Sequence, residues 1–241
     1  MPEIAIVAAL ERELVPLLRG WPVADRELGG RRFRFFEKGK QVAVCGGIGR
    51  EAARRASEAV ISLYQPSTVI SVGFAGALDL ALRVGDVLEP RYVVDAGDSS
   101  RIEIKSGQGI LVSFGSVADT AQKTSLAEAY GAKAVDMEAA SVAKSAEAHG
   151  LRFLAIKVIS DEAGFSMPPM ERFIGKEGEF QSGSFALYAG LRPWIWPSVI
   201  RLARNSVSAS RALCMRLEQL DPFGDRAATP TLAVEQGNRN R

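Results

Sequence analysis

The chain has 241 residues, and 47% of them are hydrophobic, which is enough for one sizeable core. The 30 lysines and arginines nearly balance the 28 aspartates and glutamates, so the sequence offers no basic surface for nucleic acid. There is no basic leader and no run of eighteen apolar residues, and we therefore expect a cytoplasmic protein.

Apolar runs alternate with one amphipathic segment in the first part of the chain. Residues 3–9 predict a buried strand, and residues 31–49 predict two strands joined by a hairpin around 38–40. Helical periodicity follows over 50–64, and 67–78 predicts a buried strand that ends in a glycine-containing turn.

The alternation continues in the middle of the chain. Residues 84–97 and 107–116 predict further strands, 136–150 an alanine-rich helix, and 151–159 the last strong strand. Several of these strands are continuous apolar runs, which is typical of strands covered on both faces. The pattern predicts an α/β fold in a single domain, with a central mixed, largely parallel twisted sheet flanked by helices.

The C-terminal part differs in composition. Residues 165–200 are interrupted by proline and glycine, and 198–220 predict a long amphipathic helix, so we expect an extended C-terminal helical segment. Residues 221–241 are polar and predict a flexible tail. The domain is therefore expected to span 1–220.

Cysteine and histidine are too few for several kinds of chemistry. Cys45 and Cys214 form no metal or redox pattern, and we interpret both as buried thiols. The single histidine, His149, precedes Gly150 and indicates a helix end rather than a catalytic base. A histidine-built metal site is not available.

Three carboxylates lie where predicted strands end or a helix begins. Glu13 follows the first strand, Glu138 opens the alanine-rich helix and Asp161 follows the last strand. Ligands of open parallel sheets bind outside the carboxyl ends of the strands, and the glycine turns at 45–49 and 72–78 bring backbone amides to the same edge. We expect this edge to form an active site.

Each of these signals also has a structural explanation. The 46–49 turn could cradle a phosphate or simply be a tight turn. Glu138 could complement a helix dipole, Asp161 could cap a helix, and Glu13 could be a solvated helix charge. Their occurrence together at one edge favours a functional site.

Five sequence blocks resemble the nucleoside phosphorylase-I family, the purine and uridine phosphorylase superfamily. They are IAIVAALERELVPLL, GGIGREAA, VISVGFAGALDLALRVGDVLEP, AVDMEAASVA and AIKVISDEAG, and they cover most of 3–164. The chain is most similar to the 5′-methylthioadenosine/S-adenosylhomocysteine nucleosidase branch. The resemblance implies cleavage of the bond between a purine, preferably adenine, and ribose C1′ through an oxocarbenium-like transition state.

The resemblance also implies residue roles. Asp161 would be the acid at purine N7, with a raised pKa in a dry pocket, and Ser160 would orient it. Glu138 would hold the ribose hydroxyls beneath the developing cation, Met137 would pack on the sugar, and Glu13 would activate water. The remaining substrate-binding positions are Asp136, Val117, Phe74, Ala75, Gly76 and Ile48. No metal or organic cofactor is implied.

Departures from the family bear on the nucleophile. Glu13 stands where family phosphorylases have an arginine, and the turn at 71–74 shows no phosphate cradle. Water is therefore favoured, with phosphate as an alternative co-substrate held by Arg12, Arg50 or another loop. Phe74 replaces a small polar residue beside the sugar and makes that pocket more apolar, and the segment after 95–97 is shorter than usual.

The long 165–200 segment is similar to that of the hopanoid-associated phosphorylase subgroup, which is linked to removal of adenine from an adenosyl-hopanoid. Its apolar residues could line a 5′ pocket or rest on a membrane surface through 190–216. They could equally pack a C-terminal helix or a dimer interface. The residues concerned are Phe165, Met167, Met170, Phe173, Trp194 and Trp196.

Other functions stay open at this point. A non-catalytic nucleoside-binding protein would need the ribose contacts but not an acid at N7. An AMP nucleosidase or a futalosine-type hydrolase would differ only in the 5′ substituent. Because the family commonly forms symmetric assemblies, we expect a homodimer, and the partner expected in each case is a small purine nucleoside.

Overall fold

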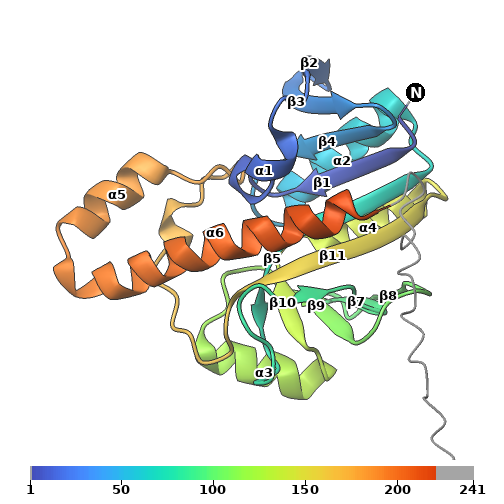
Figure 1. Ribbon diagram of the computed structural model, residues 1–241. Coiled ribbons are helices and arrows are strands. Elements are labelled where there is room, and N and C mark those ends of the chain that lie inside the picture. The colour runs from blue at the N-terminus through green and yellow to red at the C-terminus, as the bar shows by residue number, and fades with distance from the viewer. Residues whose placement is uncertain (1, 221–241) are drawn as a thin grey trace, which may run out of the picture.

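The computed structural model describes residues 2–220, which form one eleven-stranded mixed sheet with helices on both faces (Figure 1). The strand order is β2-β3-β4-β1-β5-β10-β9-β7-β8, with β11 paired to β5 and β6 paired to β11. The strands are β1 (Ile4–Ala8), β2 (Val23–Leu28), β3 (Arg31–Lys38), β4 (Gln41–Cys45), β5 (Thr68–Ala77), β6 (Val87–Leu88), β7 (Tyr92–Asp95), β8 (Arg101–Glu103), β9 (Ile110–Ser113), β10 (Ala134–Asp136) and β11 (Arg152–Asp161).

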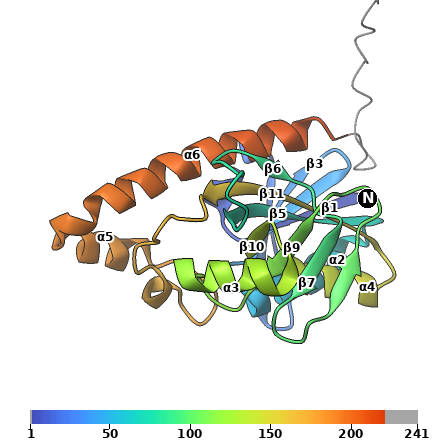
Figure 2. The ribbon, with the colours of Figure 1, turned by 90° about the horizontal axis from the view of Figure 1, so that it is seen from below.

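The helices cover the two faces unequally. They are α1 (Val15–Leu18), α2 (Arg50–Tyr64), α3 (Thr120–Tyr130), α4 (Ala139–Ala148), α5 (Ser182–Gly190) and α6 (Trp196–Glu218), with short 3-10 turns η1 (Glu11–Glu13), η2 (Glu171–Phe173) and η3 (Pro193–Ile195). The second half of α6 lies across one face of the sheet. By contrast, α5 and the first half of α6 project beyond the sheet (Figures 1 and 2).

Strand β1 shows why its sequence is a continuous apolar run. Ile4, Ile6 and Ala8 face the core that α6 closes, whereas Ala5 and Val7 face the core under α2 and α4. Successive side chains of a strand point to opposite faces, so a strand covered on both sides has no polar face. The predicted α/β architecture is confirmed.

The central strand β5 positions the edge on which the site is built. It runs parallel to β1 and β11, whereas β10 pairs with its carboxyl end in the antiparallel sense. The ends of β1, β5 and β11 therefore lie side by side. This arrangement brings together residues that are far apart in the sequence, as expected for a parallel sheet.

Some elements were not predicted. Strands β2 and β8 and helices α3 and α5 are present in addition to the expected ones. Helix α3 lacks a clear apolar stripe, but it begins with a capping box: Gln122 N donates to Asp119 Oδ1 over 2.8 Å, and Asp119 N donates to Gln122 Oε1 over 2.9 Å. This local signal would have located the helix.

His149 is the C-cap of α4, as predicted, and its Nε2 lies 2.9 Å from Glu58 Oε2. Both cysteines are free; Cys214 is buried as expected, but Cys45 is only half-buried. No helix within residues 2–220 is long and apolar enough to cross a membrane. The predicted tail, 221–241, lies outside the described residues.

Candidate active site

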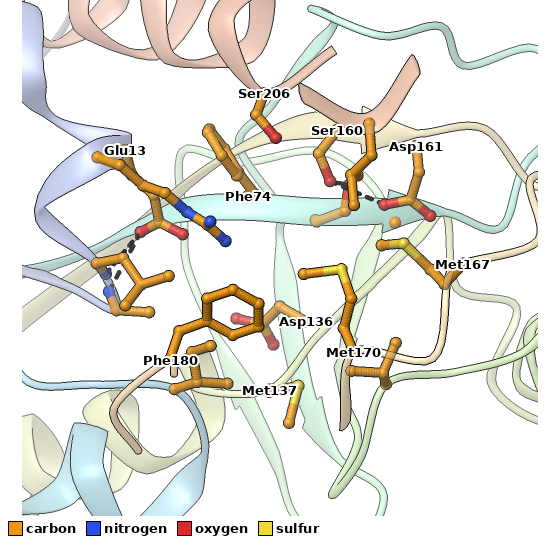
Figure 3. Close-up of a pocket in the computed structure, with 18 of the residues that line it drawn as sticks. Glu13, Phe74, Asp136, Met137, Ser160, Asp161, Met167, Met170, Phe180 and Ser206 are labelled. Carbon is orange, nitrogen blue, oxygen red and sulfur yellow. Dashed lines mark hydrogen bonds between the residues drawn. The ribbon is translucent and has the colours of Figure 1, made fainter. Parts of the chain in front are cut away.

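A cavity of about 700 Å³ opens at the carboxyl ends of β1, β5 and β11. All the residues proposed from the sequence as catalytic or substrate-binding line it (Figure 3). They come from the loop after β1, the turn before α2, the end of β5, the loop before α3, the β10–α4 junction and the end of β11. The structure thus brings every one of these positions to one place, while their roles stay predictions.

Ser160 and Asp161 reach the cavity together because β11 contains a bulge. Ile159 pairs with Ala75 and Asp161 pairs with Gly76, so Ser160 is the extra residue. A bulge re-aims side chains that would otherwise point to opposite faces. Ser160 Oγ donates to Asp161 Oδ1 over 2.8 Å, and the Asp161 side chain is buried. Asp161 ends a strand and does not cap a helix.

Lys123 is the residue that the sequence analysis missed. It comes from the first turn of α3, its side chain is 3% exposed, and its Nζ forms an ion pair with Asp161 Oδ2. The same ammonium donates to the Glu162 carbonyl over 3.0 Å. Asp161 is thus buried, as expected for a dry pocket, but it also faces a buried cation that the sequence did not predict. The capping box that begins α3 is the signal that could have pointed to this position.

Glu13 lies across the cavity from Asp161 (Figure 3). Its Oε2 accepts hydrogen bonds from the backbone N–H groups of Ala9 (3.2 Å) and Leu10 (3.3 Å). Only 5% of the residue is exposed, so the solvated-charge explanation is wrong. Burial raises the pKa of Glu13, and the nearby Lys157 ammonium partly opposes that rise.

A buried ion pair adjoins the cavity where β10 leads into α4. Lys157 Nζ lies 2.9 Å from Asp136 Oδ2, and both side chains are almost fully buried. Asp136 also accepts from Ser113 Oγ over 2.5 Å and from Ala139 N over 2.8 Å. Burial alone would lower the pKa of Lys157, but the carboxylates of Asp136 and Glu138 raise it overall. Asp136 thereby connects β9 and β11 to the first residue of α4.

Glu138 stands at the N-cap of α4 and accepts from Gly49 N over 2.7 Å. Burial, followed by repulsion from Asp136, raises the pKa of Glu138 to about 7. The glycine turn before α2 is thus used to hold a carboxylate. Ile48 N donates to Gly178 O over 2.7 Å, which packs the same turn against the 175–179 loop.

The two arginines considered for phosphate differ in position. Arg50 Nη2 is paired with Asp95 and does not line the cavity. Arg12 does line it, with its guanidinium 5.2 Å from the centre of the Phe180 ring. A phosphate site at Arg50 is therefore not supported, and Arg12 is the arginine of the two that could reach a second substrate.

One side of the cavity is apolar and is built by the C-terminal segment. Its residues come from the 165–181 loop, α5 and α6, and Met167, Met170 and Phe180 are seen pointing inward in Figure 3. The others are Ile174, Phe185, Val199, Leu202 and Val207. The remaining candidates do not line the cavity, so the pocket alternative is wrong for them: Phe165 and Phe173 are buried in the packing outside it, and Trp194 and Trp196 are exposed.

Within residues 2–220, no group of three or more histidine, cysteine, aspartate or glutamate side chains is arranged to hold a metal ion.

Comparison with known proteins places the chain in a family. The chain belongs to the phosphorylase superfamily, whose sequence pattern matches residues 3–110 and 95–179. It is 26% identical over 212 residues to the 5′-methylthioadenosine/S-adenosylhomocysteine nucleosidase of Staphylococcus aureus (strain JH9), covering 72% of this chain and 92% of that protein. The predicted resemblance is confirmed.

Solved structures show the same fold. Futalosine hydrolase of Helicobacter pylori strain 26695 aligns with a TM-score of 0.64 at 19% identity, covering 91% of this chain and 98% of that chain. The 5′-methylthioadenosine/S-adenosylhomocysteine nucleosidase of Campylobacter jejuni aligns with a TM-score of 0.64 at 18% identity, covering 91% of this chain and 100% of that chain.

Proposed function

We propose that the protein hydrolyses the N-glycosidic bond of a purine nucleoside, with adenine as the preferred base. One observation carries the proposal: Glu13 and Asp161 face one cavity from opposite sides (Figure 3), and the residues that line this cavity include Glu138. A nucleoside held with its base at Asp161 and its ribose at Glu138 would present C1′ towards Glu13. The similarity to known nucleosidases supports this reaction class.

The proposed reaction divides the work between these carboxylates. As the C1′–N9 bond breaks, its electron pair moves into the purine and the ribosyl group becomes cationic. Asp161 delivers a proton to purine N7, and the negative charge of Glu138 stabilises the ribosyl cation. Water adds to C1′ and gives a proton to Glu13, whose raised pKa suits a general base. The products are the free base and a ribose with an anomeric hydroxyl.

Water is proposed over phosphate because the carboxylate of Glu13 stands beside the nucleophile position and would repel an anion. Adenine release from 5′-methylthioadenosine, measured with and without phosphate, tests this choice. Release that is independent of phosphate supports the hydrolase. Release that requires phosphate would make the protein a phosphorylase and would point to Arg12. No release of base from any purine nucleoside would contradict catalysis and favour a binding protein.

The apolar side of the cavity favours a bulky apolar 5′ substituent. Met170, Phe180, Phe185 and Leu202 form a wall that suits an apolar substituent better than the 5′-phosphate of AMP, although Arg12 and Arg211 also line the cavity. An adenosyl-hopanoid, which carries a polycyclic lipid at this position, suits such a lining. Comparing kcat/KM for adenosine, 5′-methylthioadenosine and a 5′-alkylthioadenosine with a long chain tests this preference. A flat or falling series would contradict it.

We further propose that the part of 190–216 that projects beyond the sheet rests on an anionic membrane surface, whereas the end of α6 packs on the sheet through Leu213 and Cys214. This range contains five arginines and no acidic residue. Leu191 is 70% exposed, Trp194 is 73% exposed and Ile200 is 55% exposed, on the segment that projects beyond the sheet (Figure 1). Apolar side chains beside arginines are typical of interfacial helices. A lipid-bound position would place the apolar end of the cavity near a lipid-linked substrate.

Flotation with vesicles tests this contact. The protein should float with vesicles that contain phosphatidylserine, less with purely zwitterionic ones, and poorly after Trp194→Ser with Arg192→Gln. Equal recovery of the variant would contradict the contact. The family resemblance also implies a homodimer. If the variant changes the sedimentation mass and leaves flotation unaltered, this apolar surface is the dimer interface and not a membrane contact.

A further inference from the structure

The proposed mechanism leaves one buried, charged side chain of the cavity without a role. Lys123 is 3% exposed, yet it lines the cavity together with Asp161, which its ammonium contacts directly. A buried lysine is costly unless it is paired and hydrogen-bonded, and here both conditions hold. Its place beside the residue assigned to the leaving base suggests more than a structural role.

Both carboxylate oxygens of Asp161 have a buried hydrogen-bond partner. Oδ1 lies 2.8 Å from Ser160 Oγ, and Oδ2 accepts from the Lys123 ammonium. An ammonium carries three N–H donors, so Lys123 is a proton-bearing group in direct contact with the residue assigned to the leaving base.

Local packing keeps the ammonium in place. Gly76 lies against the pair: a Cβ atom at this position would stand 3.0 Å from Asp161 Oδ2 and 3.2 Å from Lys123 Cε. The Glu162 carbonyl accepts a second hydrogen bond from the ammonium, and the Asp119–Gln122 capping box fixes the turn that carries Lys123. The pair is therefore preorganised before a substrate arrives.

We propose that Lys123 is the source of the proton that reaches N7, and that Asp161 holds and relays it. When the C1′–N9 bond breaks, the purine takes the bonding electrons. The Nζ proton passes to Asp161 and from there to N7, which leaves a neutral amine, an ionised Asp161 and a neutral purine. The amine is recharged from solvent after the base departs. This inference rests on the proposed function and deepens it.

The leaving group provides the test. Lys123→Arg keeps the charge and the ion pair, but a guanidinium does not release its proton. We expect this variant to lose roughly 10²–10³-fold in kcat on 5′-methylthioadenosine. On p-nitrophenyl ribofuranoside, whose leaving group departs without protonation, it should keep a rate close to that of the wild type. Lys133→Arg, on an exposed lysine, is the matched control.

Chemical rescue separates proton transfer from charge. The protein with Lys123→Ala should regain nucleoside cleavage when primary ammonium ions are added, and more acidic ammonium ions should rescue it faster. Full activity of Lys123→Arg on the nucleoside, or rescue that does not depend on ammonium acidity, would overturn the inference and leave Lys123 as a purely electrostatic partner. Failure of the wild type to release base from any nucleoside would instead overturn the proposed function itself.

Discussion

Ser160 Oγ donates a hydrogen bond to Oδ1 of the next residue, Asp161, over 2.8 Å. Adjacent side chains of a regular strand point to opposite faces and cannot meet in this way. The bulge opposite Ala75 and Gly76 removes that restriction at the carboxyl end of β11. Both groups therefore face the cavity, and the hydroxyl sets the direction of the carboxylate.

Removing the charge of Asp161 is the most direct test of the leaving-group assignment. We expect Asp161→Asn to lower kcat for adenine release by roughly 10²–10⁴-fold, because an amide cannot relay a proton to N7. A coupled assay for free adenine measures the loss. Glu162→Gln is the matched control, since Lys123 contacts the backbone and not the side chain of that residue. An unchanged rate in Asp161→Asn would show that Asp161 is not the group that protonates the leaving base.

The raised pKa of Glu138, about 7, predicts a pH dependence of stability. The folded protein holds this proton over a range in which the unfolded chain, with its ordinary carboxyl pKa, has lost it. Glu138 therefore reduces the free energy of unfolding as the pH rises from about 4.5 to about 7, by at most about 1.4 kcal/mol per pH unit. The loss is complete above pH 7.

Urea denaturation of the wild type and of Glu138→Gln at a series of pH values measures this effect. The variant lacks the titrating group, so its stability should fall less steeply between pH 5 and 7. Glu13 also has a raised pKa, and part of the slope should persist in the variant. Identical slopes in the two proteins would show that Glu138 is not the group that titrates.

Gly73 keeps open the space that Glu13 occupies. Its φ is +135°, and an added Cβ would stand 2.9 Å from Glu13 Oε2. We expect Gly73→Ala to displace the carboxylate and to lower kcat by roughly 10²-fold or more, with a destabilisation of about 1–3 kcal/mol from the strained backbone. Steady-state kinetics and thermal unfolding measure the two effects.

The control for Gly73 is Gly190→Ala at the end of α5, where an added Cβ has no neighbour within 4 Å. That variant should keep its activity. Normal activity in Gly73→Ala would mean that the position of Glu13 does not matter to the reaction.

The Lys157 ammonium compensates the buried negative charge of the neighbouring carboxylates and thereby stabilises the folded protein. Lys157→Met leaves Asp136 buried without its partner 2.9 Å away, and we expect a destabilisation of about 3–5 kcal/mol in urea denaturation. The double variant with Asp136→Asn should recover part of that loss. An exposed counterpart, Lys105→Met, should have little effect. A small loss in Lys157→Met would show that the cluster is not ionised.

The apolar side of the cavity should control which 5′ substituents are accepted. Leu202→Trp adds bulk from α6 at this wall, and it should lower kcat/KM for a long-chain 5′-alkylthioadenosine by roughly 10-fold or more through steric overlap. The value for adenosine should change little. Equal losses on both substrates would mean that the 5′ group lies elsewhere.

The sequence by itself was sufficient to predict three carboxylates that line the cavity and the sheet that gathers them. Glu13, Glu138 and Asp161 follow apolar runs or open a helix, and periodicity over a few residues reveals such elements. The rule that ligands bind at the carboxyl ends of parallel strands then placed them on one edge. The family resemblance and the α/β fold, both confirmed, rest on the same local signals.

Only the tertiary structure decided what these carboxylates contact. Lys123 and Asp161 are 38 residues apart in the sequence and form an ion pair. Lys123 lies in α3, which was not predicted because its apolar periodicity is weak. The bulge at Ser160, the exposure of Trp194 and the use of the Gly49 amide by Glu138 likewise depend on which elements pack together. Local sequence patterns carry no information about such partners, because burial and pairing are properties of the assembled chain.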